Sequence, residues 1–474
     1  MQNLTMLTDL YQLTMLSGYY RHGIKDKKAC FYMFFREADD LSYAVMAGNE
    51  QLKTYLENLR FTEDDVAYLR SLGLFKEDFL SYLSHFRFEG DIFLAPEGTF
   101  LFPGEPIVRV EAPLAQAQFI ETTLLNILGH QILIATKSNR VVRAAGEGTV
   151  MEFGLRRAQG PDAALYGARA AVVGGCSSTS NVLAGQLFDI PVSGTHAHSW
   201  VMSFDSELEA FRAYAEDFPD SCLLLVDTYD TLSSGVPNAI RVFKEMRAKG
   251  LKPLGIRLDS GDLCYLSREA RRMLDEAGFE DAKIVASNDL DEFIIRDLKL
   301  QGARIDLWGV GTKLITSAAR SALGGVYKLC ALEENGQMHP RIKLSDNPEK
   351  ITLPGINEVY RLYDENGMAV ADLVAPKSEE IDFSRPLTLF HPRDTWKKMT
   401  LASYRARKLL LPFFVNGKAV APSPSVKEIR AYRKEEEKSI WEQHLRPLNP
   451  QPYKVDLSNA LWELRKSMIQ SGGQ

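Results

Sequence analysis

The chain has 474 residues, of which 45% are hydrophobic and 25% charged, a composition typical of folded globular proteins. Its formal net charge of -6 gives no overall electrostatic reason to bind nucleic acid. The five cysteines are scattered without a CxxC pair, which argues against a disulfide framework or a structural zinc site and favours a reducing cytoplasm. The length exceeds one ordinary core, so we expect two domains.

The first part of the chain mixes short strand and helix patterns. Thr62 is a candidate N-cap, and Gly73 a candidate stop, for one of the predicted helices. The N-terminal MQNLTMLTDLYQ has neither a basic patch nor an apolar core, unlike a signal peptide. Strands are predicted at 31–37 and 91–96, and helices at 50–59 and 62–73.

The longest apolar run, TTLLNILGHQILIAT at 122–136, is interrupted by Asn126, His130 and Gln131. It is too short and too polar to cross a bilayer, and it is more typical of a buried helix. No membrane association is therefore expected.

The middle of the chain alternates strands and helices with a period of about 30 residues, which indicates βα units and a parallel sheet. The strands read as continuous apolar runs, as expected when both faces are covered. Either a (β/α) barrel or an open doubly wound sheet fits this pattern, and both place the site after the strands. Strands are predicted within 222–230, 254–262, 282–291 and 304–312, and the helices between them start near Pro237, Ser267 and Phe293.

Acidic residues follow three of these strands. They are Asp227 and Asp230, Asp259 and Asp262, and Asp289. A single aspartate in such a place is typically an N-cap or a turn former. Three acidic strand ends at one edge are a stronger signal, because clustered carboxylates suit Mg²⁺ or the hydroxyls of a ribose.

Two glycine-rich segments are candidates for anion binding. GVGT at 309–312 follows a strand, and GGCSSTSN at 174–181 is rich in hydroxyl groups, although both also suit plain turns. EFGLRRAQG at 152–160 places Phe153 beside Arg156 and Arg157. Arginine suits phosphate or carboxylate recognition, and a surface salt-bridge pair is the alternative. No GxxxxGK[ST] motif is present, so ATP would not be held by a P-loop.

GTHAHSWVMSF at 194–204 contains two of the eight histidines. His196 and His198 would face the same side of an extended segment and could share a metal, but no third ligand is evident. The alternatives are a hydrogen-bonded core residue for His196 and a nucleophile toward phosphorus for His198. After about residue 360 the regularity fades, apart from a charged helix predicted at 426–444 with Ile429, Tyr432 and Ile440 turned inward.

Six segments in chain order are LTDLYQLTM, EFGLRRAQGPD, SSTSNVLAGQ, GTHAHSWVMSF, IRLDSGDL and GVGT. Together they resemble the nicotinate phosphoribosyltransferase family, and the resemblance runs from about residue 4 to beyond 315. The resemblance implies an enzyme that joins nicotinate to phosphoribosyl pyrophosphate with Mg²⁺. The products are nicotinate mononucleotide and pyrophosphate in NAD salvage. It also implies coupling to ATP hydrolysis through a phosphorylated histidine, which corresponds to His198, and leaves His196 structural.

The resemblance further implies a role for individual residues. Tyr11 would stack on the pyridine ring from the partner subunit of a homodimer, opposite Phe153. Thr195 and Arg257 would hold nicotinate, with Arg257 near its carboxylate. The related nicotinamide enzyme has an acid in the stretch matching SSTSN, whereas 177–181 is neutral here and favours nicotinate. The remaining expected contacts to the substrates, mainly to the phosphoribosyl group, come from Arg156, Ser180, Asp259, Asn288, Asp289, Gly311 and Thr312.

The fold implied by the resemblance is an irregular (β/α) barrel of the type II phosphoribosyltransferase kind beside a smaller α+β domain built from both chain ends. The expected parts are an N-terminal region at 1–120, a barrel with the active site at 121–360, and a C-terminal segment at 361–474 that packs with the N-terminal part. No motif in the C-terminal segment carries the resemblance.

Two other classes of protein remain open on the sequence. A metal-dependent hydrolase would use the HxH pair with a strand-end aspartate, and tightly bound zinc would distinguish it. A non-catalytic nucleotide-binding protein on the same fold is the other. The presence of His198, Arg257, Asp259 and GVGT together argues against that second class.

Overall fold

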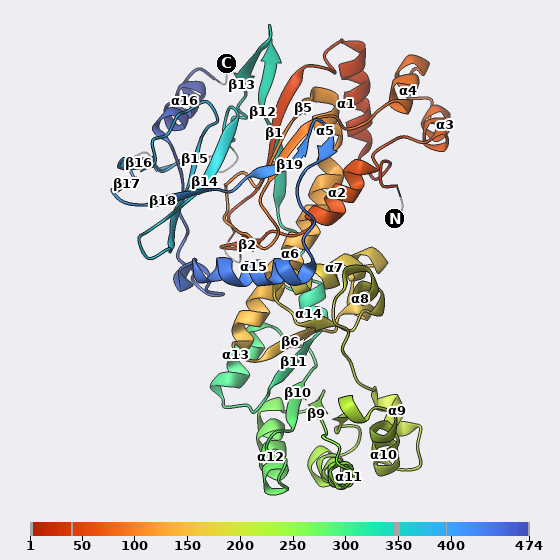
Figure 1. Cartoon of the computed structure of the whole chain (residues 1–474). Coiled ribbons are helices and arrows are strands. Elements are labelled where there is room, and N and C mark those ends of the chain that lie inside the picture. Colours follow the sequence, from red (N-terminus) through yellow and green to blue (C-terminus); the bar gives the residue numbers. More distant parts are fainter. Residues whose placement is uncertain (1–2, 39–40, 346–350, 395, 473–474) are drawn as a thin grey trace. The chain divides into compact units, whose positions relative to one another are not determined.

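The computed structural model describes residues 3–38, 41–345, 351–394 and 396–472 (Figure 1). The chain forms two compact units. Unit 1 comprises Met1–Leu133, Ala322–Pro424 and Ala431–Gln474, and unit 2 comprises Ile134–Ser321 and Ser425–Arg430. The unit built from both chain ends is the larger one, whereas a smaller domain was expected from the sequence.

Unit 1 contains a seven-stranded sheet whose strands come from segments far apart in the sequence. Strand β1 (Lys28–Phe35) lies between β5 (Val108–Pro113) and β12 (Gly325–Glu334), antiparallel to both. The predicted barrel range of 121–360 is therefore wrong at its C-terminal end, because β12 completes this sheet. The other strands are β3 (Asp91–Leu94), β13 (Gln337–Pro340), β19 (Leu411–Val415) and β20 (Lys418–Ala419).

A six-stranded sheet and a two-stranded one complete the strands of unit 1. The six strands, in spatial order, are β17 (Lys398–Leu401), β16 (Leu387–Phe390), β21 (Val455–Leu457), β15 (Ala369–Pro376), β14 (Asn357–Tyr363) and β18 (Arg405–Lys408). The short pair is β2 (Ala44–Val45) with β4 (Phe100–Leu101). Helices of unit 1 are α1 (Leu10–Arg21), α2 (Asn49–Glu57), α3 (Glu63–Ser71), α4 (Glu77–Ser84), α5 (Leu114–Phe119) and α16 (Asn459–Gln470).

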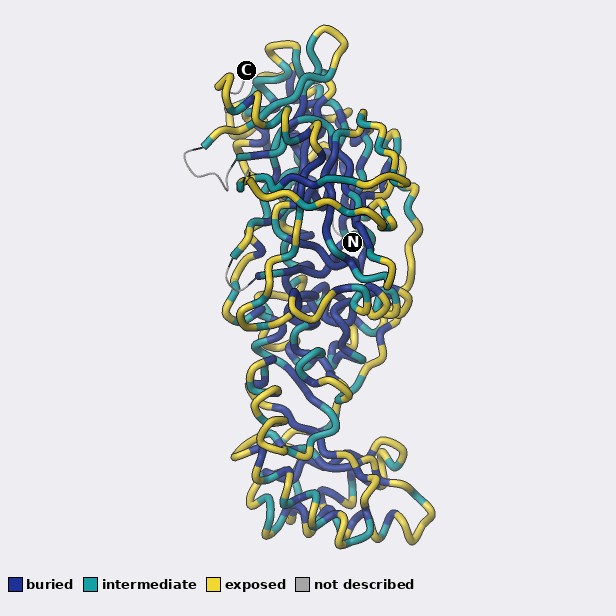
Figure 2. Tube along the Cα trace, turned by 90° about the vertical axis from the view of Figure 1, so that its left-hand side faces the viewer, coloured by how far each residue is buried: buried dark blue, intermediate teal, exposed yellow. Residues whose placement is uncertain are grey.

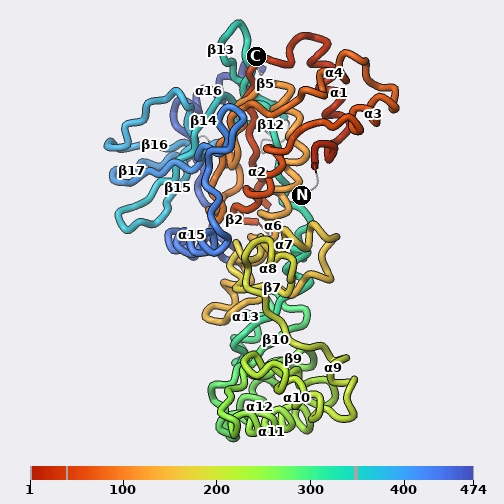
Figure 3. Tube along the Cα trace, turned by 45° about the vertical axis from the view of Figure 1, so that its right-hand side comes forward, coloured from red at the N-terminus to blue at the C-terminus, as the bar shows by residue number. Residues whose placement is uncertain are grey.

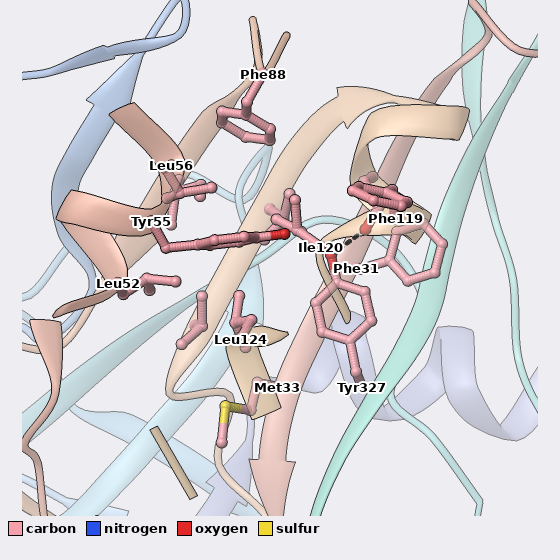
Figure 4. Close-up of a cluster of buried hydrophobic side chains, with 14 of the residues drawn as sticks. Phe31, Met33, Leu52, Tyr55, Leu56, Phe88, Phe119, Ile120, Leu124 and Tyr327 are labelled. Carbon is pink, nitrogen blue, oxygen red and sulfur yellow. Dashed lines mark hydrogen bonds between the residues drawn. The ribbon is translucent and has the colours of Figure 1, made fainter. Parts of the chain in front are cut away.

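The main core of unit 1 packs aromatic and aliphatic side chains from β1, α2 and the start of α6 (Figure 4). Phe31 stacks on Tyr327 of β12 with ring centroids 4.9 Å apart. The Tyr327 hydroxyl donates a hydrogen bond to the carbonyl of Ala117 at 2.8 Å, so its buried polar group is satisfied. Figure 2 shows that buried residues lie on the inner segments, while exposed residues lie on loops and on one side of many helices.

Two helices contribute to both units. Helix α6 (Glu121–Ala145) covers the apolar run that was predicted to be a buried helix, and Leu124 and Leu128 are fully buried in it. In the described part of the chain, no helix is long and apolar enough to cross a membrane. Helix α15 (Val426–Lys438) begins where the charged helix was predicted and ends earlier; Ile429 and Ile440 are buried as expected, whereas Tyr432 is half-buried.

Unit 2 is built on a six-stranded sheet in which every strand is parallel to its neighbours. This confirms the βα alternation read from the sequence, although the strands are two to four residues long in place of the longer runs predicted. In spatial order they are β7 (Ser178–Thr179), β6 (Thr149–Glu152), β11 (Leu307–Val310), β10 (Lys283–Ala286), β9 (Gly255–Leu258) and β8 (Leu223–Leu225).

The segment at 190–196 contacts both edge strands of this sheet. Val192 bridges to Thr179 of β7, and the Thr195 hydroxyl donates to the carbonyl of Leu223 in β8 at 2.6 Å. The same short segment reaches both edges because the sheet is curled, as in a barrel that closes irregularly.

Helices connect the strands of unit 2, and α11 lies beside both α10 and α12 (Figure 3). Helix α12 begins at Leu263, earlier than the predicted Ser267, because the side chain of Asp262 accepts a hydrogen bond from the backbone of Tyr265 and caps it. The helices are α7 (Pro161–Gly174), α8 (Val182–Phe188), α9 (His198–Met202), α10 (Glu207–Asp217), α11 (Val236–Ala248), α12 (Leu263–Glu276), α13 (Glu292–Leu300) and α14 (Thr312–Ile315).

Candidate active site

The candidate site lies at the carboxyl edge of the parallel sheet in unit 2. Because the six strands run in one direction, the residues that follow them share this edge. Most of the predicted site residues occupy these loops, and Thr195 and His198 lie just before and at the start of α9. The residues after the strands are Phe153 and Arg156 (β6), Ser180 (β7), Asp227 (β8), Asp259 (β9), Asn288 and Asp289 (β10), and Gly311 and Thr312 (β11).

His198 reaches groups from two neighbouring strand ends. Its Nδ1 lies 3.1 Å from the Thr228 hydroxyl, and its Nε2 lies 3.8 Å from Oδ2 of Asp259. The side chain is 39% exposed, so the ring is held on one side and open on the other. The sequence analysis had not singled out Thr228, although it directly follows Asp227 at a strand end.

Arg257 is held in place through three different nitrogens. Its Nε donates to the Ser287 hydroxyl at 3.0 Å, Nη1 to the carbonyl of His196 at 3.3 Å, and Nη2 to Oδ1 of Asp259 at 3.3 Å. The Arg257 side chain is only 16% exposed. A planar guanidinium fixed by three acceptors is suited to recognise a carboxylate.

Asp259 connects Arg257 to His198, since one of its carboxylate oxygens faces each. The turn that carries Asp259 is held by the buried carboxylate of Asp227. Oδ2 of Asp227 accepts the Asp259 N–H at 2.8 Å and the Ser260 hydroxyl at 2.6 Å. Asp227 therefore orients the loop through Oδ2, while its buried Oδ1 has no hydrogen-bond partner among the described residues, and Ser260 is a further residue that sequence reasoning missed.

The other strand-end acids do not gather here. Asp230 accepts hydrogen bonds from the backbone of Leu232 and Ser233, and Asp262 caps α12. Asp289 is exposed, with a positive φ of 40°. The predicted cluster of carboxylates is therefore reduced to Asp259 supported by Asp227, because capping uses two of the acids.

His196 is buried, and its ring faces protein on all sides. Its Nε2 accepts the Leu225 N–H at 3.3 Å, its Nδ1 lies 3.4 Å from the carbonyl of Ala197, and Tyr214 packs edge-on with centroids 4.6 Å apart. Burial lowers the pKa of His196 to about 4, so the ring is neutral at pH 7. The pair does not form a shared metal site, because both nitrogens of His196 face the backbone.

No three His, Cys, Asp or Glu side chains in the described residues are grouped so that they could hold a metal ion. A metal-dependent hydrolase, the alternative considered from the sequence, would need such a group of ligands with both histidines of the HxH pair in it.

The glycines of GVGT make room for Phe153. A Cβ on Gly309 would lie 2.6 Å from the Phe153 ring, and one on Gly311 would lie 3.1 Å from the Phe153 carbonyl. Close approach of an aromatic side chain thus accounts for these glycines at least as well as anion binding does. Thr312 follows as the first residue of the short helix α14.

Arg156 and Arg157 lie on a single 3-10 turn (Leu155–Arg157) and are exposed. Within the described parts of the chain neither has a salt-bridge partner, so the alternative of a surface ion pair does not hold. Their charges are free for an anionic ligand.

The SSTSN stretch at 177–181 forms a strand end and a helix start. Asn181 caps α8 by accepting the Ala184 N–H at 3.2 Å. Ser178 and Ser193 share a hydroxyl contact at 2.6 Å, and Thr179 donates to the buried carboxylate of Glu152 at 2.6 Å. Glu152 is another functional candidate that sequence reasoning missed; its only signal was an acid at the end of an apolar strand.

Thr195 and Tyr11 complete the predicted set. The Thr195 hydroxyl donates its proton to the carbonyl of Leu223, which leaves that oxygen only as an acceptor. Tyr11 lies on α1 in unit 1 and is 48% exposed.

Comparison with known proteins covers nearly the whole chain. Residues 149–363 match the model of the "Nicotinate phosphoribosyltransferase (NAPRTase) family", residues 6–129 match its N-terminal domain, and residues 356–465 match its C-terminal domain. The C-terminal segment, which carried no recognised motif, thus also matches the family.

Nicotinate phosphoribosyltransferase from Bacillus subtilis is 49% identical over 469 residues, covering 98% of this chain and 95% of the relative. The crystal structure of human nicotinic acid phosphoribosyltransferase aligns with a TM-score of 0.86 at 31% identity, covering 98% of this chain and 100% of that one. A nicotinate-nucleotide pyrophosphorylase from Pyrococcus furiosus has the same fold, with a TM-score of 0.70 at 24% identity. The chain belongs to the nicotinate phosphoribosyltransferase family.

Proposed function

We propose that the protein transfers the phosphoribosyl group of phosphoribosyl pyrophosphate to nicotinate, giving nicotinate mononucleotide and pyrophosphate for NAD biosynthesis. The observation that carries this proposal is the Arg257–Asp259–His198 constellation in a member of this family. One carboxylate lies between a fixed guanidinium and an accessible imidazole. The fold is then an irregular barrel of the type II phosphoribosyltransferase kind, and its curled parallel sheet supports this assignment.

Arg257 and Phe153 recognise nicotinate. The guanidinium of Arg257 binds the carboxylate, and the ring of Phe153, backed by Gly309, stacks on the pyridine. Tyr11 of the partner subunit covers the opposite face of the pyridine. The side chains at 177–181 carry no charge, so nothing in that stretch repels a carboxylate or favours an amide.

The phosphoribosyl group is bound by loops at the same edge of the sheet. Arg156 supplies a free positive charge, and Thr312 and the backbone of Gly311 supply donors for phosphate oxygens. Ser180, Asn288 and Asp289 are further contacts for this substrate. Departure of pyrophosphate leaves positive charge on the ribose while the pyridine nitrogen attacks, so positioning and charge stabilisation supply most of the catalysis.

His198 accepts a phosphoryl group from ATP. The bond between the γ-phosphorus and ADP breaks, and a bond to a ring nitrogen forms, which water later hydrolyses to phosphate. Nε2 is the nitrogen we assign to this role, because Nδ1 is occupied by the Thr228 hydroxyl. The Thr228 contact also keeps the imidazole in one orientation.

Asp259 would hold Mg²⁺ beside the substrate phosphates. A phosphoryl group on Nε2 would bring negative charge toward Asp259, whose Oδ2 lies 3.8 Å from that nitrogen. Asp259 suits Mg²⁺ because carboxylate oxygens are its preferred protein ligands. Bound Mg²⁺ supplies neutralisation of the phosphate charge.

A product assay tests the proposed reaction. Purified protein, Mg²⁺ and phosphoribosyl pyrophosphate are incubated with nicotinate or nicotinamide, with and without ATP, and the mononucleotide is identified by mass spectrometry. We expect nicotinate mononucleotide, with more formed when ATP is present. Product from nicotinamide alone would contradict the assignment of the 177–181 pocket. No product from either base, together with stoichiometric tightly bound zinc, would favour a metal-dependent hydrolase.

A further inference from the structure

Glu152 is a buried carboxylate at the carboxyl end of β6 with no role in the scheme above. Its side chain is fully buried, and burial raises its pKa, an effect that its two hydrogen bonds oppose. Oε2 accepts the Thr179 hydroxyl at 2.6 Å, and Oε1 accepts the N–H of Gly154. Both oxygens act as acceptors, which is the pattern of an ionised carboxylate.

The two groups that Glu152 holds belong to two different loops of the site. Gly154 directly follows Phe153, the residue assigned to the pyridine ring. Thr179 directly precedes Ser180, and its oxygen accepts the Asn181 N–H at 3.0 Å. The backbone carbonyl of Glu152 also accepts the Ser180 N–H at 2.9 Å. Glu152 therefore links the loop after β6 to the loop after β7.

A third loop closes against the same point. A Cβ on Gly154 would lie 2.5 Å from Cβ of Ile315 and 2.8 Å from Oε1 of Glu152, so the backbone there is packed on both sides. Ile315 belongs to α14, directly after GVGT. A buried charge is costly unless it is fully hydrogen-bonded. The carboxylate at this junction therefore favours only those relative positions of the loops that keep both of its hydrogen bonds.

We infer that Glu152 is a positioning residue for the transfer reaction, whose carboxylate fixes Phe153 and the Ser180 loop relative to each other so that the pyridine ring is correctly oriented. This inference rests on the proposed function. Glu152 acts through Gly154 and Thr179 and does not itself touch the substrate.

Glu152→Gln tests the requirement for two acceptors. A carboxamide has one acceptor oxygen and a nitrogen that only donates, whereas Gly154 N–H and the Thr179 hydroxyl are both donors. If the Thr179 hydroxyl rotates so that its oxygen accepts from the amide as well as from Asn181, the hydroxyl proton loses the acceptor that the carboxylate provided, so one hydrogen bond is still lost. We expect the KM for nicotinate to rise about tenfold, the scale of one lost charge-assisted hydrogen bond, with a smaller change in kcat.

Thr179→Val and Thr179→Ser form the matched pair for the same contact. Valine removes the hydroxyl and should raise the KM for nicotinate as Glu152→Gln does, whereas serine keeps the hydroxyl and should restore near wild-type KM. The double variant Glu152→Gln with Thr179→Val should be no worse than Thr179→Val alone, because valine already removes the hydrogen bond to Glu152 together with the acceptor of the Asn181 N–H. If Glu152→Gln does not fold, the comparison of Thr179→Val with Thr179→Ser tests the inference by itself.

Amide hydrogen exchange separates this inference from the reaction itself. Peptides covering 153–157 and 179–184 should exchange faster in Glu152→Gln and in Thr179→Val, while peptides from α11 and α12 remain unchanged. Normal exchange in those two loops overturns the inference, whether or not the wild-type protein makes nicotinate mononucleotide. A lowered thermal midpoint with an unchanged KM for nicotinate in the active enzyme also overturns it, because that result indicates a merely structural residue.

Discussion

His196 and His198 are two residues apart, yet their imidazole rings have opposite surroundings. His196 is buried against Tyr214 and accepts a backbone hydrogen bond from β8, while His198 begins α9 with its ring partly open. The buried, hydrogen-bonded state suggested for His196 is observed, whereas the role of His198 as a phosphate acceptor stays a prediction. The sequence did not reveal that the carbonyl of His196 also holds Arg257, because that contact joins residues 61 positions apart.

Removing the imidazole of His198 should uncouple the reaction from ATP. We expect His198→Ala to retain slow transfer to nicotinate without ATP, because Arg257 and Phe153 remain in place, and to lose all stimulation by ATP. Initial rates of nicotinate mononucleotide formation, with and without ATP, provide the measurement. A variant that still responds fully to ATP would exclude His198 as the phosphorylated residue.

Burial of His196 should make the fold sensitive to acid. Its pKa is about 4 in the folded protein against an ordinary 6.5, so below about pH 6.5 the unfolded chain binds a proton that the folded chain excludes. The associated stability is complete above pH 6.5 and is lost as the pH falls toward 4, by up to about 3 kcal/mol.

The measurement is the thermal midpoint between pH 7.5 and pH 4.5, followed by tryptophan fluorescence. We expect His196→Gln to lose less stability than the wild type over this range, because glutamine does not titrate. His22→Gln, which changes an exposed histidine, is the matched control and should follow the wild type. Equal acid sensitivity in wild type and His196→Gln would show that other groups dominate.

At the scale of elements, acidic residues at strand ends divide between helix capping and the site. The βα rhythm allowed the sequence to place the strands between 222 and 312, and the order of strands and helices in that range was correctly predicted. Which acid caps a helix was not predictable, because the capping role depends on where the helix begins. Helix α12 begins at Leu263 and so uses Asp262, leaving Asp259 to face Arg257 and His198.

This division predicts opposite effects for two neighbouring aspartates. Asp262→Ala removes the cap of α12 and should lower the free energy of unfolding by about 1 kcal/mol without changing the KM for phosphoribosyl pyrophosphate. Asp259→Ala should leave the cap intact and abolish most transfer activity. Urea unfolding and steady-state kinetics on both variants provide the comparison, and equal loss of activity in Asp262→Ala would place that carboxylate on the substrate.

At the scale of the whole molecule, the assignment of chain segments to units depends on strand pairing over long sequence distances. Strand β12 pairs with β1, about 300 residues earlier, and this pairing takes residues after 321 out of unit 2. Neither strand carries a local signal for its partner, so the expected boundary near 360 and the expected smaller domain were wrong. The four strands β8 to β11 were predictable because neighbours are joined by local βα connections, whereas the pairing of β6 with β11 joins residues about 158 positions apart and was not predicted.

Mixing two inactive variants tests whether the site is shared between subunits of a homodimer. In the proposed arrangement each site combines the Arg257 of one subunit with the Tyr11 of the other. Tyr11→Ala lies in unit 1 and Arg257→Ala in unit 2, so a heterodimer of the two variants has one intact site and one doubly altered site.

An equimolar mixture that re-associates at random contains half heterodimers, and its activity should reach about a quarter of the wild-type value. Each variant alone, treated in the same way, is the control and should remain nearly inactive. If Tyr11 instead serves the site of its own subunit, every site in the mixture carries one substitution. The mixture would then be no more active than the two variants separately, and the shared site would be excluded.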